Sequence, residues 1–357
     1  MTCILEINDA DLTLYREHEV LHRSPGIAVV LGKEICFGAD ALRLSRIHPR
    51  QTNLQYFTRL NGEPLATPGE RARNHADLVY LHLQVFKPMI EAEGGQVLLA
   101  VPGILTADQL GVLLGVLQEV GIGVRGFVDS AVAAVTTQEA PGEAFCVDVM
   151  MQRAVVTALQ VNGEVAKTGV QEVVECGMNR LLEGWINVIA DRFVRETRFD
   201  PLHAAATEQQ LFDQLYGWIR GGARGADVPM EIHHQDHTRR VELGRALLED
   251  KGEQRFRQLA DALPRGARVF VSARGARLPG LMHALTALHM HAVALPEDAL
   301  TRGCLDNLGS IMREDGELRL VTRLPHGSAP AQQPLPPAAA ALPPAASDSQ
   351  TCRPAPP

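Results

Sequence analysis

Apolar runs separated by polar turns predict a β-meander over residues 1 to about 48. The strand-like pieces are "CILEI", "LTLY", "GIAVVL" and "EICFG", and turn residues separate the later ones at 24–26 and 32–33. The polar turn 8–11, "NDAD", joins the first two pieces into a hairpin. Helical spacing follows in "GADALRLSRI", and residues 51–73 are polar and turn-rich.

A long amphipathic helix and a β-α-β unit come next. Apolar residues at helical spacing predict the helix over 74–93. "QVLLAVP" then indicates a buried strand, and "ADQLGVLLGVLQEVG" indicates a helix that Thr106 caps and Gly121 ends. A strand at 123–129 leads into the small-residue helix "SAVAAV".

The same order of elements recurs in the second half of the chain. "AFCVDVMMQRAVVTALQVNGEVAK" indicates another meander with a hairpin turn at 162–163, and "CGMNRLLEGWINVIADRFVRET" indicates a long helix. Residues 201–261 are mostly helical, with a glycine-rich break at 221–225 and a β-like insert near 231–241. "ARVFVS" and "PGLMHALTALH" add a strand and a helix. We therefore predict a duplicated α/β fold.

Composition narrows the possible functions. The chain has 357 residues, 46% of them hydrophobic, with a net charge of -8, and its 34 basic residues are scattered, which argues against a nucleic-acid partner. Six widely spaced cysteines without a CxxC pair favour reduced thiols in the cytoplasm. We find no signal peptide and no apolar run that could span a membrane. From residue 325 to 357 the chain is rich in Pro and Ala, so we predict a disordered tail there.

Four segments carry a resemblance to a known superfamily. They are "EICFGADALRLSRIHPRQTN", "LLAVPGILTADQLGVLLGVLQEVGIGVRGFVDSAVAAV", "ARGARLPGLMHAL" and "PEDALTRGCLDN". In order and spacing they resemble the nucleotide-binding domain of the actin, Hsp70 and sugar-kinase superfamily, most closely its Hsp70 side. The resemblance implies a duplicated ribonuclease-H-like, actin-like ATPase fold with two lobes around a cleft, each built on a five-stranded mixed sheet with flanking helices. It places the N-terminal lobe at 1–137 and the C-terminal lobe at 138–324, with a helical insertion at about 190–260.

The first phosphate loop of that superfamily is changed here. The family's Asp-x-Gly-Thr turn falls on residues 6–9, where Asn8 replaces the glycine and Asp9 replaces the threonine. Glycine lets backbone N–H groups approach a phosphate, whereas a nearby carboxylate repels it by roughly 1 kcal/mol or more. This turn is therefore poorly suited to phosphate.

The other two nucleotide loops of the superfamily have also lost their glycines here. The family's Asp-x-Gly-Gly-Gly-Thr-x-Asp loop falls on 148–155, and its glycines are lost. The cofactor-loop residues singled out by the resemblance are Asp148, Met150, Met151 and Arg153 in this loop, and Ala273, Arg274 and Arg277 in the adenosine loop. Met150 and Met151 are expected to fill the phosphate space, and Arg153 offers one compensating charge. Gly177 is the remnant of a further glycine-rich loop.

We therefore expect a pseudo-ATPase without a cofactor or metal that acts as an interaction or regulatory module with protein partners, self-association included. The alternative is an ATP-binding and hydrolysing Hsp70-like chaperone or actin-like filament protein, with Glu6 and Asp148 around Mg²⁺ as the weak catalytic candidates. A small-molecule kinase is the least favoured alternative. The chain ends where an Hsp70 continues into its substrate-binding domain, so no unfolded-peptide clamp is expected.

Three further features each allow both a purely structural and a functional interpretation. "EIHHQDH" at 231–237 contains metal-ligating residue types, but an exposed loop is favoured because neighbouring residues of a strand face opposite sides. Asp129 either caps a helix or once oriented a water, and the cap is favoured. The stretch 192–215 is either a solvated helical pair or a partner-docking surface.

Overall fold

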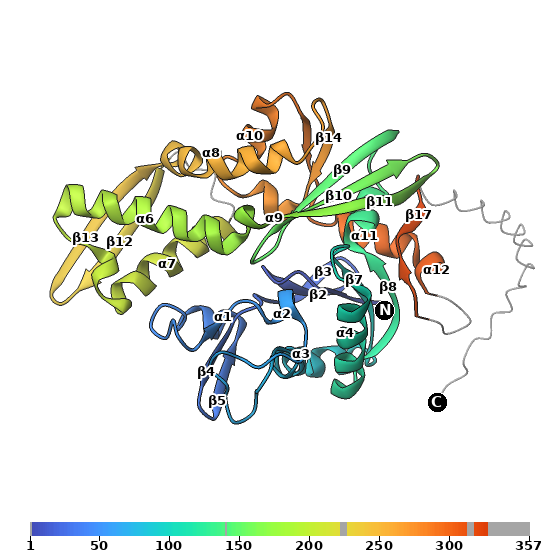
Figure 1. Cartoon of the computed structure of the whole chain (residues 1–357), viewed down its shortest axis with the longest axis horizontal. Coiled ribbons are helices and arrows are strands. Elements are labelled where there is room, and N and C mark those ends of the chain that lie inside the picture. The colour runs from blue at the N-terminus through green and yellow to red at the C-terminus, as the bar shows by residue number, and fades with distance from the viewer. Residues whose placement is uncertain (1, 140, 222–226, 313–317, 328–357) are drawn as a thin grey trace, which may run out of the picture. The chain divides into compact units, whose positions relative to one another are not determined.

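The computed structural model describes residues 2–139, 141–221, 227–312 and 318–327 and shows a mixed α/β fold (Figure 1). Two six-stranded sheets form its centre, and a three-stranded and a two-stranded sheet accompany them. The three-stranded sheet has the order β5 (Glu34–Phe37), β4 (Ala28–Leu31) and β6 (Thr52–Asn53). Among the residues described, no helix is both long and apolar enough to cross a membrane.

The first large sheet combines a meander with parallel strands. Its order is β3 (Glu19–Ser24), β2 (Leu12–Arg16), β1 (Cys3–Glu6), β7 (Gln96–Val101), β8 (Gly123–Asp129) and β16 (Leu320–Val321). Strands β1 to β3 pair antiparallel, whereas β7 is parallel to β1 and β8 is parallel to β7. The predicted N-terminal hairpin and β-α-β unit therefore join in one sheet.

The second large sheet repeats the order of the first five of these strands. It runs β17 (Arg323–Pro325), β11 (Glu164–Val173), β10 (Ala154–Val161), β9 (Gly142–Val149), β14 (Arg268–Val271) and β15 (His291–Ala294). Strands β9 to β11 pair antiparallel, and β14 and β15 follow in parallel beside β9. In each half, a meander is followed by two parallel strands on the side of its first strand.

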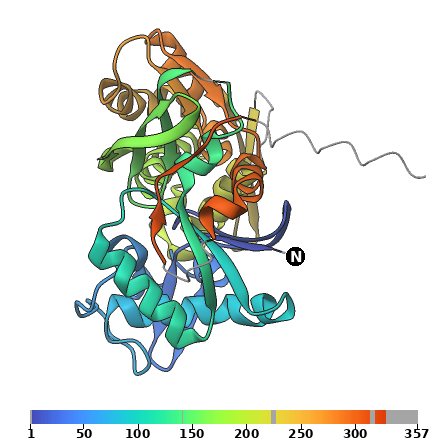
Figure 2. The same cartoon turned by 90° about the vertical axis from the view of Figure 1, so that its right-hand side faces the viewer.

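Each sheet has one strand more than the five that we predicted. The segment from residue 320 to 325 supplies both extra strands, because β16 pairs with β8 and β17 pairs with β11 (Figure 2). The predicted tail therefore starts too early, since Pro325 is part of β17. The rest of that prediction, residues 328–357, lies outside the described residues.

Helices cover the sheets and fill the space between them. They are α1 (Gly38–Leu42), α2 (Tyr56–Arg59), α3 (His75–Ala92), α4 (Ala107–Val120), α5 (Ser130–Val135), α6 (Met178–Thr197), α7 (Ala205–Arg220), α8 (Arg245–Asp261), α9 (Ala273–Ala276), α10 (Leu281–Ala287), α11 (Ala299–Asp306) and α12 (Leu308–Ile311). Neighbouring residues of β1 show the layers: Leu5 packs in the apolar cluster of α3 and α4, whereas Ile4 packs in the cluster of α5 and α11. That second cluster also contains Cys146 and Phe270 of the other sheet, so α5 and α11 lie between the two sheets.

Local sequence signals explain several helix ends. Thr106 accepts a hydrogen bond from the backbone of Gln109 and begins α4, and Gly121 ends it in the left-handed region at φ 85°, as predicted. The predicted helix over 74–93 is α3, which Asn74 caps in the same way through Asp77. The predicted β-like insert is a longer hairpin of β12 (Asp227–His234) and β13 (His237–Gly244). Of the predicted glycine-rich break, residues 222–225 lie outside the described residues.

Helical spacing runs through "GADALRLSRI", but the helix ends early, at Leu42. A helix would continue through a hydrogen bond from the Arg46 N–H to the Leu42 carbonyl. Here the buried side chain of Gln209, from α7, donates to the Leu42 oxygen at 2.9 Å and accepts from the Arg46 nitrogen at 2.8 Å. One amide from a distant helix therefore replaces the helical hydrogen bond.

Gly303 allows α11 to cross α5 closely. A Cβ atom at this position would lie 1.8 Å from the carbonyl oxygen of Ala133. We expect Gly303→Ala to lower the free energy of unfolding by about 2–4 kcal/mol, because rigid backbone must move apart. Chemical denaturation measures the loss. Gly115→Ala is the control: it lies within α4 with open space around it, so we expect a small gain of about 0.5–1 kcal/mol.

Candidate functional site

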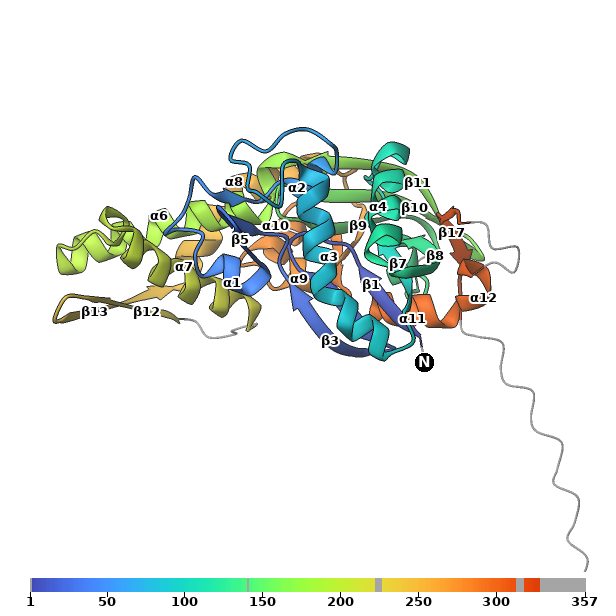
Figure 3. The same ribbon diagram turned by 90° about the horizontal axis from the view of Figure 1, so that it is seen from below.

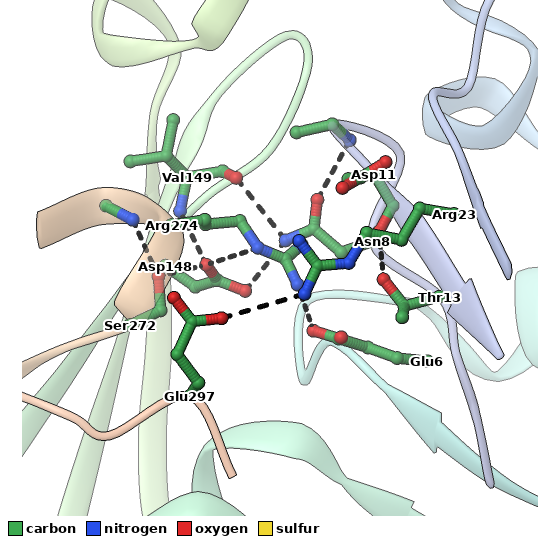
Figure 4. A network of polar contacts seen from close by, with 12 residues as sticks. Glu6, Asn8, Asp11, Thr13, Arg23, Asp148, Val149, Ser272, Arg274 and Glu297 are labelled. Carbon is green, nitrogen blue, oxygen red and sulfur yellow. Dashed lines mark hydrogen bonds and ion pairs between the residues drawn. The ribbon is translucent and has the colours of Figure 1, made fainter. Parts of the chain in front are cut away.

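The turns that end β1 and β9 meet where the two halves of the chain face each other (Figure 4). The Asn8 side chain donates to the Asp148 carboxylate at 2.7 Å and to the Val149 carbonyl at 3.3 Å. Its own oxygen accepts from the backbone of Ala10 at 2.9 Å. Asn8 is 2% exposed and joins the two turns directly, at the position where the resemblance leads us to expect a glycine.

Asp9 makes a second connection between these turns. Its carboxylate accepts from the Met151 backbone N–H at 2.7 Å and from the Thr58 hydroxyl at 2.9 Å. Burial raises the pKa of the Asp9 carboxyl, while the Met151 and Thr58 hydrogen bonds favour its charged form. At this turn an aspartate carboxylate therefore accepts the backbone N–H of the facing loop.

The backbone of the second loop is also occupied. The Met150 N–H bonds to the Arg153 carbonyl at 2.8 Å, and the Met150 and Met151 carbonyls accept from the first two N–H groups of α6, at 2.9 and 3.0 Å. Gly177 precedes that helix because a Cβ there would lie 2.3 Å from the carbonyl carbon of Gln152. The N–H groups that can wrap a phosphate at such a helix start are therefore used within the protein.

Arg274 lies at the centre of the site. It is in α9, just after β14, and its guanidinium forms an ion pair with Glu6 and lies 3.8 Å from Asp148 (Figure 4). Burial alone would lower the pKa of Arg274, but the Glu6 and Asp148 carboxylates outweigh burial and raise that pKa. The guanidinium therefore stays charged, and it neutralises the two carboxylates that were the catalytic candidates.

Both carboxylates have further partners. Glu6 is 5% exposed and accepts from the Tyr15 hydroxyl at 3.0 Å, and burial raises the pKa of its carboxyl against the effect of Arg274. Asp148 accepts from the Ser272 hydroxyl at 2.6 Å and from Asn8. In the part of the chain that is described, no group of three or more His, Cys, Asp or Glu residues is arranged to hold a metal ion.

A small cavity of about 90 Å³ adjoins this network. Its lining includes Glu6, Asp148, Met150, Ala273 and Arg274. A second pocket of about 680 Å³ shares Arg23, Ala273, Arg277 and Glu297 with this lining, and its volume lies in the range of roughly 300–1,000 Å³ that ligand pockets have.

Two predicted contact residues have partners within the protein. Arg277 lines the cavity, forms an ion pair with Glu297 and donates to the Arg220 carbonyl at 3.5 Å. Arg153 pairs with Glu172 at 2.6 Å on β11 and does not line the cavity. A compensating role for Arg153 in that cavity finds no support in this geometry.

The other sequence candidates have structural roles. Asp129 accepts from the backbone of Ala131 and Val132 at 3.0 and 3.3 Å, which confirms the predicted N-cap, and it also pairs with Lys167 at 3.1 Å. The "HHQDH" histidines lie at the end of the β12–β13 hairpin, where His233 and His237 are exposed.

Sequence reasoning placed Arg274 in the adenosine loop and missed its contacts. Part of the signal was position: Asp148 and Arg274 stand near the carboxyl ends of the neighbouring strands β9 and β14, whereas Glu6 ends β1 of the other large sheet. Known protein-family models and curated proteins were both searched with the chain, and neither comparison finds a match.

Proposed function

We propose that this chain is an Hsp70/actin-like nucleotide-binding-domain protein with a duplicated ribonuclease-H-like fold that has lost ATP hydrolysis and works as an interaction or regulatory module. The repeated strand order of its two large sheets supports the duplicated fold. The four family-like segments of the sequence support the Hsp70 side of the superfamily. The loop substitutions at Asn8, Asp9, Met150 and Met151 support the loss of phosphate binding.

The position of Arg274 carries this proposal. A triphosphate with Mg²⁺ needs carboxylates free to hold the metal or its waters, and backbone N–H groups free to hold the phosphates. Here Glu6 and Asp148 neutralise a guanidinium, and the N–H groups of Met150 and Met151 bond to protein oxygens. The residues present do not fit Mg²⁺-ATP, and the protein fills its own phosphate site.

An arginine can itself bind a phosphate, so the guanidinium alone does not exclude an anion. Three carboxylates oppose such binding. Glu6 and Asp148 face Arg274 and Asp11 lines the same cavity, and each would repel a phosphate. We therefore assign Arg274 to neutralising these carboxylates within the protein.

Isothermal titration with ATP and with ADP, each with excess Mg²⁺, tests the proposal. We expect no saturable heat up to millimolar nucleotide and no phosphate release. Micromolar binding with turnover would contradict the pseudo-ATPase assignment and favour the active chaperone or filament protein. A pull-down from a native extract then identifies the partner on which an interaction module acts.

A further inference from the structure

The β12–β13 hairpin lies at one end of the described fold, beside α6 and α7 (Figures 1 and 3). Along both strands, one face is buried, with Val228, Met230, Ile232, Val241 and Leu243 against the helices. Only two strands make up this sheet, so it has two edges with backbone groups that need partners.

The edge of β12 is closed by side chains. Gln210 donates to the His233 carbonyl at 3.0 Å and accepts from the His233 N–H at 2.9 Å. Gln214 binds Glu231 in the same way, at 2.6 and 2.8 Å. Pro229, the next residue along this edge, has no N–H to offer. Two glutamine amides and a proline therefore leave β12 without a free edge for another strand.

The edge of β13 has no such cover. Thr238, Arg240 and Glu242 stand opposite His233, Glu231 and Pro229, so their backbone groups point away from β12. Among the described residues, none hydrogen-bonds to these outward N–H and C=O groups. All three residues are exposed. The hairpin thus has one closed and one open edge.

We propose that the open edge of β13 pairs with the same edge of a second copy of this chain. In an antiparallel pair centred on Val241, Arg240 stands opposite Glu242 of the second copy, and Glu242 opposite its Arg240. Both side chains are more than 60% exposed, and they attract each other already within one chain, at 3.5 Å. The sequence of this edge is therefore complementary to itself across a twofold axis.

This pairing gives a four-stranded antiparallel sheet whose outer edges are both closed by Gln210 and Gln214, so the assembly stops at a dimer. The contact is short, and exposed ion pairs contribute only about 0.2–1 kcal/mol each, so we expect a weak dimer at high micromolar concentration. If the proposed interaction role holds, a second copy of this chain is one of its partners.

Sedimentation velocity of the full chain over a range of concentrations tests the proposal. We expect the wild type to shift from monomer to dimer as concentration rises, and Arg240→Glu or Glu242→Arg alone to weaken dimerisation by about tenfold or more. An equimolar mixture of the two variants restores opposite charges at both positions and should dimerise again. Circular dichroism checks that these surface variants stay folded.

A wild type that stays monomeric at every concentration overturns the proposal. So do single variants that dimerise as the wild type does, or a mixture that fails to recover. These results are independent of the nucleotide titration, because neither residue lines the cavity at Arg274.

Discussion

Replacing Arg274 by alanine is expected to lower the free energy of unfolding by about 3–5 kcal/mol. The substitution leaves Glu6, which is 5% exposed, and Asp148 facing each other without a counter-charge. Removing one partner of a buried ion pair costs more than the pair contributes, because the remaining charge has lost its solvation. Urea denaturation of both proteins at pH 7 measures the difference.

Two comparisons isolate the charge effect at Arg274. Arg257→Ala removes an exposed arginine that pairs with Glu253 on the same helix, so we expect a loss below about 0.5 kcal/mol. Adding Glu6→Gln to Arg274→Ala removes the uncompensated charge and should recover part of the stability. A loss below about 1 kcal/mol for Arg274→Ala would mean that the guanidinium is not neutralising these carboxylates.

Acidification is expected to destabilise the protein through His82. This histidine is fully buried in α3, between the Ser24 hydroxyl at 2.6 Å and the Tyr56 hydroxyl at 2.7 Å. Burial lowers the pKa of His82 from 6.5 to about 3, with a smaller contribution from His22. Below pH 6.5 His82 is therefore protonated in the unfolded chain but stays neutral in the folded chain. The free energy of unfolding falls as the pH falls toward 3.

His82→Gln isolates this effect, because glutamine does not titrate. Between pH 7 and pH 4 the wild type should lose about 3 kcal/mol more unfolding free energy than the variant loses. Thermal or urea unfolding at the two pH values gives the comparison. His283→Gln changes an exposed histidine on α10 and should have a small effect at both. Equal pH dependence in wild type and His82→Gln would show that His82 titrates normally.

Much of the fold could be predicted from local pattern. The helix over 74–93, the capped helix after Thr106 and both meanders follow from periodicity and turn chemistry, which act over a few residues. The early end of α1 could not be predicted, because it depends on the Gln209 amide 163 residues away from Arg46. The strands β16 and β17 were also missed, since two or three residues carry no periodic signal.

The candidate site, too, could be predicted only in part from the sequence. The absence of glycine at Asn8, Met150 and Met151 is visible in the sequence, and it predicts a loop that does not wrap a phosphate. The contacts of Arg274 are not visible there, because they depend on how two strand ends from opposite halves of the chain meet. Neither Glu6 nor Asp148 is near it in sequence.

A crystal structure determined with a saturating magnesium-bound ATP analogue tests the central claim most directly. We expect the Arg274 guanidinium between Glu6 and Asp148, the Asn8 amide on Asp148, and no ordered triphosphate beside them. An analogue bound between the two sheets, with Arg274 displaced and its phosphates held by the backbone of residues 8 and 150, would contradict the account.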